Sequence, residues 1–328
     1  MTLLRTEDLT VHYRVRRGLT RKAVDVVHAA DAVNIALDKG QTLALVGESG
    51  CGKTTVAMAV LGLAKITAGS VVFDGRDVTG LRGKKRREVA RRMQVVFQDP
   101  YSSLDPRMTV HDIVSEPLTT DRSMTAAERS ERVQSLLERV ALGTQHLWRR
   151  PHEFSGGQCQ RIAIARALAL SPDFIVLDEP TSALDVSVQA RILILLKELQ
   201  ASLGLAYLFI AHDLAVVEAV ADQVAVMYLG RIVEKGSAAT VFAQPLHPYT
   251  VALLESIPSP DPERRSLGPE LTGEVPSAVN PPRGCRFHPR CSFRMHECES
   301  VEPVMRRVGD HEVACHLQLP RASTLEGA

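Results

Sequence analysis

The chain has 328 residues, 45% of them hydrophobic and 23% charged, a composition typical of a globular protein that excludes disorder along the whole length. Lysine and arginine number 39 against 38 aspartates and glutamates, so the net charge of +1 gives no indication of nucleic-acid binding. No apolar run approaches the roughly 20 residues that cross a bilayer, and Glu7 and Asp8 stand where a secretion signal has its apolar core. We therefore expect a soluble, cytosolic chain of one large or two modest domains.

The N-terminal part of the chain is predicted to be mostly strand. Apolar and polar residues alternate as in a half-buried strand at Leu9, Val11, Tyr13 and Val15. The arginine-rich residues 14–22 predict a loop, and Asp74-Gly75 predicts a hairpin turn. Further strands are expected at residues 33–37, 42–47, 71–73 and 93–97. Helices are expected at residues 55–64 and 84–92, the second with a basic face in solvent.

The rest of the chain alternates helices and buried strands up to a change in composition near Pro245. Residues 99–150 are predicted to be mainly helical, with 123–139 the clearest amphipathic segment. Helices are then expected at 162–170 and 186–203, and strands at 174–177, 206–210 and 224–228. From Pro245 to Pro282 the chain is rich in proline and lacks periodicity. We predict a domain over residues 1–245, with a helical subdomain at about 99–165, and an extension over residues 246–328.

Residues 47–54, here called the phosphate loop, read GESGCGKT and fit the pattern G-x-x-x-x-G-K-[ST] without a mismatch. The pattern stands between a predicted strand and a predicted helix, so backbone N–H groups and the helix N-terminus can surround phosphate oxygens. Lys53 can reach the β- and γ-phosphates, and the Thr54 hydroxyl can bind Mg²⁺. The expected ATP contacts in this region are Gly47, Ser49, Gly50, Cys51, Gly52, Lys53, Thr54 and Thr55.

Two carboxylates follow a buried strand in FIVLDEP, residues 174–180. In parallel α/β sheets ligands bind at the carboxyl ends of the strands, where Asp178 and Glu179 stand. Asp178 can hold Mg²⁺, and Glu179 can polarise an attacking water. An acidic strand end alone is often only a solvated terminus. Together with the phosphate loop, it predicts nucleotide hydrolysis.

Residues 154–161, FSGGQCQR, lie between these two motifs and resemble the LSGGQ signature of the ATP-binding-cassette (ABC) ATPases. The resemblance implies that Tyr13 stacks on adenine and that His212 in FIAHD is a switch histidine. It also implies that Gln98 in VVFQDP senses Mg²⁺ and the membrane partner. Phe154 replaces the usual leucine and keeps an apolar anchor, and Cys159 stands where a polar residue is common.

The same resemblance implies a head-to-tail dimer in which each subunit completes the other's nucleotide site. The residues acting in trans would be Ser155, Gly156, Gly157, Gln158 and Asp185. Ser155 and the two glycines open a helix, which again offers N–H groups to an anion. The implied fold is α/β: a parallel-sheet core around the phosphate loop, an antiparallel β subdomain, a helical signature subdomain and a cysteine-rich C-terminal extension.

Residues 97–110 and 247–258, with the cysteines that follow, resemble the oligopeptide/dipeptide/nickel importers and their "F"-type ATPase subunit. The resemblance implies ATP-driven peptide import at the cytoplasmic face of the inner membrane. The implied partners are a paralogous "D"-type ATPase, two transmembrane permeases and an external solute-binding protein, without nucleic acid. Nickel or another small solute, in place of peptides, stays open as the imported substrate. A DNA-repair ABC ATPase is disfavoured because the chain lacks a long coiled coil, and a non-hydrolysing scaffold because Lys53, Glu179 and His212 are present.

Four of the six cysteines, Cys285, Cys291, Cys298 and Cys315, crowd the last part of the chain. A cytosolic chain keeps its thiols reduced, so these residues predict metal binding before disulfides. Thiolates suit zinc or an iron–sulfur cluster, and the resemblance implies a [4Fe–4S] cluster. Zinc and the absence of a metal stay open, with His288, His296 and His316 as alternative ligands.

Overall fold

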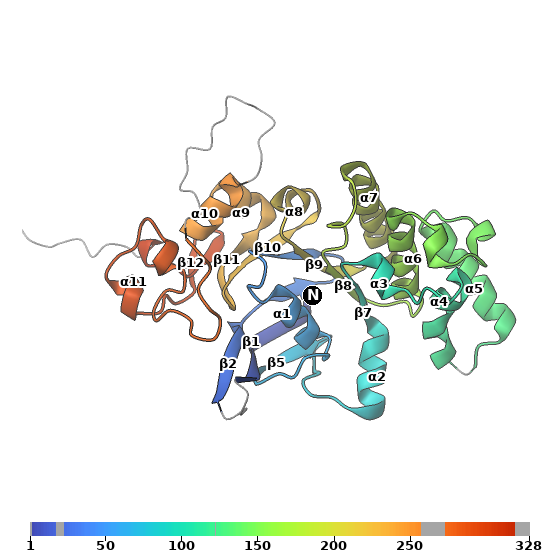
Figure 1. Ribbon diagram of the computed structural model, residues 1–328, viewed down its shortest axis with the longest axis horizontal. Helices are drawn as coiled ribbons and strands as arrows, with labels where there is room; N and C mark the ends of the chain where they lie inside the picture. The colour runs from blue at the N-terminus through green and yellow to red at the C-terminus, as the bar shows by residue number, and fades with distance from the viewer. Residues whose placement is uncertain (1, 18–22, 122, 257–272, 319–328) are drawn as a thin grey trace, which may run out of the picture.

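The computed structural model describes residues 2–17, 23–121, 123–256 and 273–318, which form two sheets with helices on either side (Figure 1). The first is a five-stranded antiparallel sheet in the order β2-β1-β5-β6, with β3 also paired to β1. Its strands are β1 (Thr2–Arg17), β2 (Ala23–Val33), β3 (Ala36–Asp38), β5 (Ala68–Phe73) and β6 (Arg76–Asp77). Among the described residues, no helix is both long enough and apolar enough to span a bilayer.

The second sheet has eight strands in the order β12-β13-β11-β10-β4-β9-β8-β7. In order along the chain they are β4 (Thr42–Val46), β7 (Met93–Val96), β8 (Phe174–Asp178), β9 (Ala206–Ala211), β10 (Gln223–Tyr228), β11 (Arg231–Ser237), β12 (Arg306–Val308) and β13 (His311–Val313). The run β10-β4-β9-β8-β7 is parallel. Every residue of β4, β8 and β9 is buried, because helices and the first sheet cover both faces of this core.

Parallel pairing brings the chemistry-bearing segments to one edge of the second sheet. Val46 pairs with Ala211, and Asp178 pairs with Ile210. The chain therefore leaves β4, β8 and β9 at the same edge, toward the phosphate loop, Glu179 and His212 respectively. Helix α1 (Lys53–Val60) begins inside the phosphate loop. This is the edge at which ligands bind in open α/β sheets.

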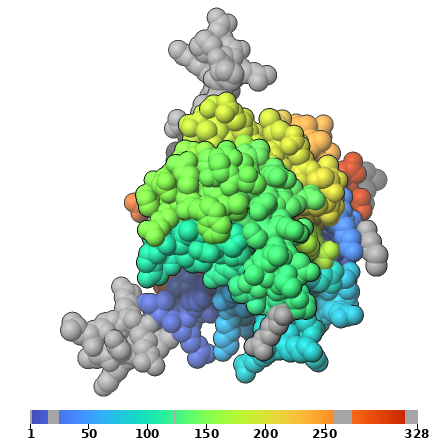
Figure 2. All heavy atoms as spheres, turned by 90° about the vertical axis from the view of Figure 1, so that its right-hand side faces the viewer, coloured from blue at the N-terminus to red at the C-terminus, as the bar shows by residue number. Residues whose placement is uncertain are grey.

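A helical subdomain lies at one end of the molecule and forms the green surface in Figure 2. Its helices are α3 (Pro100–Ser103), α4 (Val110–Ser115), α5 (Ala126–Arg139) and α6 (Gly156–Leu168), with 3₁₀ turns η1 (Glu116–Thr120), η2 (Thr144–His146) and η3 (Pro151–Glu153) between them. Helix α5 is capped by Thr125, which exchanges hydrogen bonds with Glu128. Beyond this subdomain run α7 (Val186–Leu203) and α8 (Leu214–Val220).

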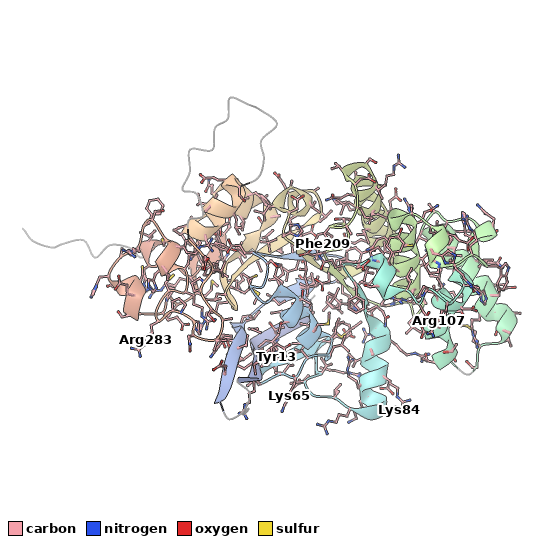
Figure 3. All side chains as sticks on the ribbon, viewed as in Figure 1. Tyr13, Lys65, Lys84, Arg107, Phe209 and Arg283 are labelled. Atoms are coloured by element: carbon pink, nitrogen blue, oxygen red, sulfur yellow. The ribbon has the colours of Figure 1, made fainter. Side chains whose placement is uncertain are left out.

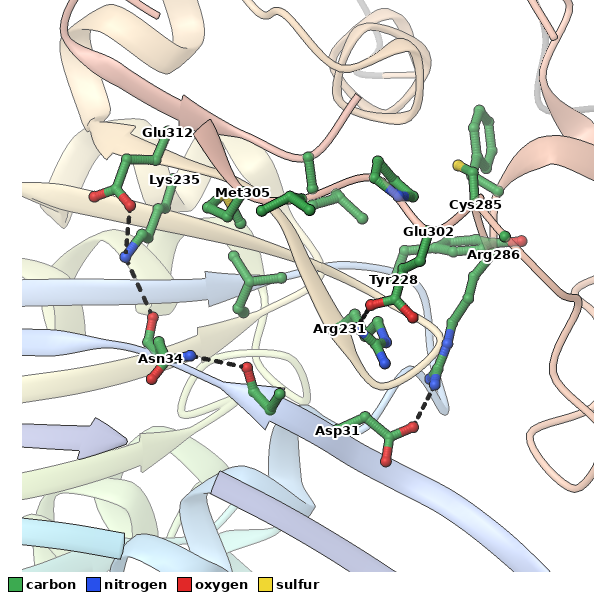
Figure 4. Close-up of a pocket in the computed structure, with 18 of the residues that line it drawn as sticks. Asp31, Asn34, Tyr228, Arg231, Lys235, Cys285, Arg286, Glu302, Met305 and Glu312 are labelled. Carbon is green, nitrogen blue, oxygen red and sulfur yellow. Dashed lines mark hydrogen bonds and ion pairs between the residues drawn. The ribbon is translucent and has the colours of Figure 1, made fainter. Parts of the chain in front are cut away.

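The extension lies at the opposite end of the molecule (Figure 1). Its elements are α10 (Pro248–Glu255), η4 (His288–Arg290), α11 (Glu297–Ser300), β12, β13 and η5 (His316–Gln318), and α9 (Ala238–Ala243) precedes it. Strand β13 pairs with β11, so the extension lengthens the second sheet. Lys235 lies 3.2 Å from Glu312, and Arg286 forms an ion pair with Asp31 (Figure 4).

Glu234 on β11 is fully buried, and the hydrogen-bond partners of its carboxylate come from the chain that follows β11. Its carboxylate accepts hydrogen bonds from the backbone N–H groups of Leu246 at 2.8 Å and His247 at 2.9 Å. His311 Nδ1 on β13 lies 3.1 Å from the same carboxylate. The domain boundary near residue 245 stays a prediction, since one sheet and one buried carboxylate join its two sides.

Several strand predictions were wrong. Residues 14–17, expected in a loop, continue β1, which pairs with β2 in an antiparallel ribbon; residues 18–22 lie outside the described residues. The strand expected at 33–37 is divided between the end of β2 and β3. Strands β2, β11, β12 and β13 were not predicted. Strands β2, β11 and β13 each pair with the preceding strand in an antiparallel hairpin. Their stability depends on contacts with the partner strand, which the local sequence does not reveal.

The basic helix α2 (Gly83–Arg92), where Figure 3 labels Lys84, has no buried residue. This confirms the solvated face expected from its charge pattern.

Candidate functional site

The phosphate loop joins β4 to α1 and is closed by Lys53. The Lys53 ammonium donates hydrogen bonds to the backbone oxygens of Gly47 at 2.6 Å and Glu48 at 3.0 Å. The lysine is buried, so its charge lies within the loop. Helix α1 starts after Gly52 without a side-chain cap, and its first N–H groups stay available to an anion.

Two glycines of the loop are required by the backbone around them. Gly47 and Gly52 have φ angles of 149° and 111°, which favour glycine. A Cβ on Gly47 would lie 2.1 Å from the Met227 backbone oxygen, and one on Gly52 would lie 2.0 Å from the Ala29 backbone oxygen. The loop is thus pressed against β10 and β2, and neither neighbour can move as a side chain could.

Asp178 and Glu179 have different environments at the end of β8. Asp178 is buried, and its Oδ1 accepts a hydrogen bond from the Thr54 hydroxyl at 3.2 Å. Burial raises the pKa of Asp178, and the Thr54 hydrogen bond opposes that shift. A hydroxyl beside a carboxylate is a donor set that suits Mg²⁺.

Glu179 is held between two side chains from other segments. Gln98 Nε2 donates to Glu179 Oε2 at 2.7 Å, and His212 Nδ1 lies 3.2 Å from Oε1. The Glu179 backbone N–H donates to Ile210 O at 3.0 Å, and its φ of 46° is in the strained left-handed region. Such strain is typical of functional sites, because the surrounding structure must fix it.

These groups surround one pocket of about 630 Å³. The predicted residues that line it are Tyr13, Ser49, Gly50, Gly52, Lys53, Thr54, Thr55, Gln98, Glu179 and His212. Tyr13 is 41% exposed on β1, and Figure 3 shows it on the first sheet, well apart from Arg107 of the helical subdomain. An aromatic ring, N–H groups, an ammonium and carboxylates together match the parts of ATP with Mg²⁺.

Three residues of the pocket were missed by the sequence analysis: Val27, Ala29 and Ala278. The first two belong to the unpredicted strand β2. Ala278 comes from the extension, where its backbone oxygen accepts a hydrogen bond from His28 N at 2.9 Å. No local pattern marks these residues: Val27 and Ala29 reach the pocket because β2 pairs with β1, and Ala278 reaches it through a contact with a distant segment.

Three residues predicted for the chain's own nucleotide site do not line the pocket. Cys51 is buried, and burial raises the pKa of its thiol, so its side chain is a neutral packing group. Gly47 lies against the backbone of Met227, and Asp178 is buried and reaches the site through its hydrogen bond with the Thr54 hydroxyl. The contribution of Gly47 and Cys51 is limited to the backbone path of the loop.

The residues predicted to act in trans lie outside the pocket. Ser155 caps α6, where its oxygen accepts from Gln158 N and its own N–H donates to the Gln158 side chain. Asp185 caps α7, accepting from Val188 N at 2.9 Å. Gly156 and Gly157 form the first turn of α6. One chain does not bring these residues to its own pocket, and their action in trans stays a prediction.

The four C-terminal cysteines are near one another without forming a compact ligand set. Cys285 and Cys298 are buried, and burial raises the pKa of the Cys285 thiol to about 11, with smaller contributions from the other three thiols. Tetrahedral zinc, with bonds of about 2.3 Å, requires sulfurs under about 4 Å apart. Over the ranges that the structure describes, His12, His28 and Asp31 are the one group of three or more metal-ligand types within 4.8 Å. The geometry therefore does not support zinc at these cysteines, and the [4Fe–4S] cluster, whose cysteine ligands bind four separate irons and stand farther apart, stays a prediction.

The group around Asp31 is an ion-pair network in the present arrangement. Asp31 contacts His12 and His28, and Arg286 pairs with its second oxygen (Figure 4). Burial raises the pKa of Asp31, but the hydrogen bonds from His12 and Arg286 outweigh it and hold this pKa at about 2. A guanidinium in this position disfavours a second cation. The network ties the first sheet to the extension.

Two family models match the chain. The ABC transporter model matches residues 30–182, and the model of the oligopeptide/dipeptide transporter C-terminal region matches residues 233–298. The first covers the phosphate loop, the signature and Glu179. The second covers most of the antiparallel strand β11, helices α9 and α10 and three of the four C-terminal cysteines.

Curated relatives are similar over nearly the whole length. The probable peptide ABC transporter ATP-binding protein y4tS of Sinorhizobium fredii is 49% identical over 98% of this chain and 91% of its own. The di/tripeptide transport ATP-binding protein DppF of Pseudomonas aeruginosa and the oligopeptide transport ATP-binding protein AppF of Bacillus subtilis are each 47% identical, over 96% of this chain and 97% of their own.

Solved structures share the fold of the ATP-binding region. The ATP-binding cassette MJ0796, in a dimeric post-hydrolysis state bound to ADP and phosphate, has a TM-score of 0.64 and 28% identity over 72% of this chain and 99% of its own. The protein cbiO1 of Clostridium perfringens, part of the ABC transporter complex cbiONQ, has a TM-score of 0.64 and 29% identity over 74% of this chain and 91% of its own.

Proposed function

This chain belongs to the ATP-binding proteins of ABC transporters, and we propose that it hydrolyses ATP to power the import of di- and oligopeptides through membrane permeases. One observation carries the ATPase part. A single pocket contains the phosphate loop, the aromatic Tyr13 and a glutamate held between a glutamine and a histidine. The peptide part rests on the relatives of similar length and on the match over residues 233–298.

The division of labour follows from the contacts. Lys53 and the open N–H groups of α1 would bind the phosphates, and Thr54 with Asp178 would hold Mg²⁺, which neutralises phosphate charge when bound. Glu179 would orient the attacking water, because its carboxylate faces the pocket at the end of β8. Gln98 and His212 would keep that carboxylate aimed, one at each oxygen.

We extend the proposal to a head-to-tail dimer with a paralogous "D"-type subunit. The signature residues 155–158 and Asp185 lie outside the chain's own pocket, which is consistent with action in trans. MJ0796, a neighbour in fold, was solved as a dimer with ADP and phosphate. Two permeases and an external binding protein would complete the assembly at the cytoplasmic face of the inner membrane.

The test of the solute is ATPase stimulation in the assembled transporter. The full complex, in lipid vesicles, is given its binding protein loaded with a dipeptide, a longer peptide or nickel. We expect the peptide-loaded protein to stimulate hydrolysis and the nickel-loaded protein to leave it at the basal rate. If only the nickel-loaded binding protein stimulates hydrolysis, the alternative hypothesis that the transporter imports a small solute is correct. Stimulation by DNA, without permeases, would contradict the transporter assignment.

The four-cysteine metal site is kept as a separate hypothesis, supported by the crowding of Cys285, Cys291, Cys298 and Cys315. Full-length protein purified without oxygen is assayed for iron, zinc and acid-labile sulfide, with its visible spectrum. About four iron and four sulfide per chain would support a [4Fe–4S] cluster. Zinc alone would support a structural metal. If the protein contains neither iron nor zinc, the metal-site hypothesis is refuted and the ATPase proposal is unaffected.

A further inference from the structure

The extension binds the phosphate loop at Glu48, the second residue of the loop. Arg290 Nη1 donates to Glu48 Oε2 at 2.7 Å, and Nη2 donates to Oε1 at 3.0 Å, although the two residues are 242 positions apart. The backbone N–H of Glu48 donates to the Tyr249 hydroxyl on α10 at 2.8 Å. Both the side chain and the backbone of one loop residue are therefore fixed by the extension.

Arg290 is held firmly in place. Its side chain is 5% exposed, and the guanidinium lies 5.9 Å from the centre of the Tyr228 ring. That ring packs edge-on against Tyr249 at 4.7 Å and Phe287 at 5.2 Å. The hydrogen bonds to the Glu48 carboxylate make the largest contribution to the pKa of Arg290 and raise it above its usual range, so the guanidinium stays charged. Buried aromatic packing and a two-pronged hydrogen bond leave this arginine little freedom.

Glu48 places a negative charge in a loop shaped to bind polyphosphate. Its side chain is 23% exposed, and its backbone oxygen accepts from Lys53. Without a counter-charge, the carboxylate would repel the phosphates and attract Lys53 away from them. The Arg290 cation removes that repulsion and at the same time fixes the segment that carries the Lys53 acceptor.

We propose that Arg290 is a positioning residue for ATP binding: it neutralises Glu48 and fixes the phosphate loop, so the extension sets the chain's affinity for ATP. Arg290 does not line the nucleotide pocket and acts through Glu48. The inference rests on ATP binding by the phosphate loop and goes beyond it, since it gives the extension a role in the affinity itself.

The test measures binding of a non-hydrolysable ATP analogue with Mg²⁺ to the full-length chain, together with KM and kcat for ATP. We expect Arg290→Met to raise Kd and KM about ten-fold, the scale of a lost charge-assisted pair. The value of kcat should stay within about two-fold, since Arg290 does not line the pocket that contains Gln98, Glu179 and His212. Arg290→Lys should fall between, since it keeps the charge and loses the fork.

Glu48→Gln is expected to change Kd in the opposite direction from Arg290→Met. It therefore keeps the proposal testable if Arg290→Met is unstable. This variant leaves the Arg290 cation next to the phosphate loop without its counter-charge, so the loop becomes more positive and Kd should fall below the native value. The double variant Arg290→Met with Glu48→Gln should return Kd close to native. Arg294→Met, an exposed arginine in the same extension, is the matched control and should keep the native Kd.

Three results would overturn the proposal: a native Kd in Arg290→Met, weaker binding in Glu48→Gln of the same size as in Arg290→Met, or no recovery in the double variant. The last two would mean a purely structural contact. A native chain that does not bind the analogue would overturn the proposed function as well. If the native chain binds the ATP analogue and the variants behave as in one of these three results, only the inference about Arg290 fails and the proposed function stands.

Discussion

The phosphate loop and the signature residues 155–158 are both glycine-rich and both open a helix, yet they are built differently. In the phosphate loop Gly47 and Gly52 have positive φ angles, and α1 has no side-chain cap. In the signature Ser155 and Gln158 cap α6 reciprocally, and its glycines are helical. A Cβ on Gly157 would lie 2.3 Å from Val188 Cγ1, so this glycine permits close packing of α6 on α7.

The difference shows two uses of the same composition. The phosphate loop is a cradle whose shape is fixed from behind by β2, β10 and the extension, with its donors open toward the chain's own pocket. The signature is a closed, capped helix start that presents a small-residue surface away from that pocket. The first is suited to bind a ligand by itself, and the second to complete a site on another chain.

The largest expected effect is on the rate of ATP hydrolysis, at Glu179 after the end of β8, where a substitution should lower turnover without weakening nucleotide binding. Glu179→Gln should lower kcat by about 10²–10⁴-fold, since it removes the carboxylate that orients water, and should leave analogue binding in place. The measurement is steady-state ATP hydrolysis beside equilibrium binding. Glu128→Gln, the same exchange in the cap of α5, is the control. Turnover in Glu179→Gln within about three-fold of native would show that Glu179 lacks this role.

The cradle is tested at Gly52. Gly52→Ala would bring a Cβ within 2.0 Å of the Ala29 backbone oxygen, so the loop must deform. We expect analogue affinity to fall on the order of 100-fold, equivalent to about 3 kcal/mol. Gly40→Ala is the matched control, because Gly40 also has a positive φ, of 71°, with no atom within 4 Å of the added Cβ. Equal losses in both variants would mean that backbone strain, not the cradle, sets the affinity.

The signature is tested at Ser155. Ser155→Ala should lower the ATPase rate of the assembled dimer about ten-fold and the free energy of unfolding by about 1 kcal/mol, as a lost N-cap does. Analogue binding to the isolated chain should stay native. Thr125→Ala removes a capping box of the same type from α5, so it should show the stability loss without the rate loss. Weakened binding in Ser155→Ala would contradict the proposed difference between the two motifs.

The smallest expected effect concerns the support of the cradle by α10. His247 Nδ1 accepts from Tyr249 N at 3.0 Å, and burial lowers the pKa of His247 to about 3. An unfolded histidine titrates near 6.5, so the unfolded chain binds an extra proton below that pH and stability falls as the pH drops. Denaturant unfolding should show a loss of about 1 kcal/mol between pH 6.5 and 5.5.

The control for this prediction is His247→Asn, which keeps an N-cap side chain without titrating in this range. The stability of the native chain relative to this variant should fall by about 1 kcal/mol between pH 6.5 and 5.5, because only the native chain carries the titrating histidine. A difference that stays constant over the same window would refute the role of His247.

The sequence predicted the parts of the site that are local in the chain. The phosphate loop, Asp178, Glu179 and His212 each follow a short apolar strand, and parallel pairing brings the ends of those strands together. The contributions of Ala278 and Arg290 could not be predicted, since each depends on a contact with a distant segment and follows no repeat or motif. The cysteine spacing indicated proximity, but the positions of the sulfur atoms depend on how the loops fold.

The shared second sheet has a consequence for dividing the molecule. A chain ended at residue 245 would lose β13 and so expose the backbone N–H and C=O groups of β11 as a new edge. The buried carboxylate of Glu234 would lose its hydrogen bonds from residues 246 and 247 and its contact with His311. An unprotected edge strand pairs readily with another copy. The shortened protein is therefore expected to aggregate.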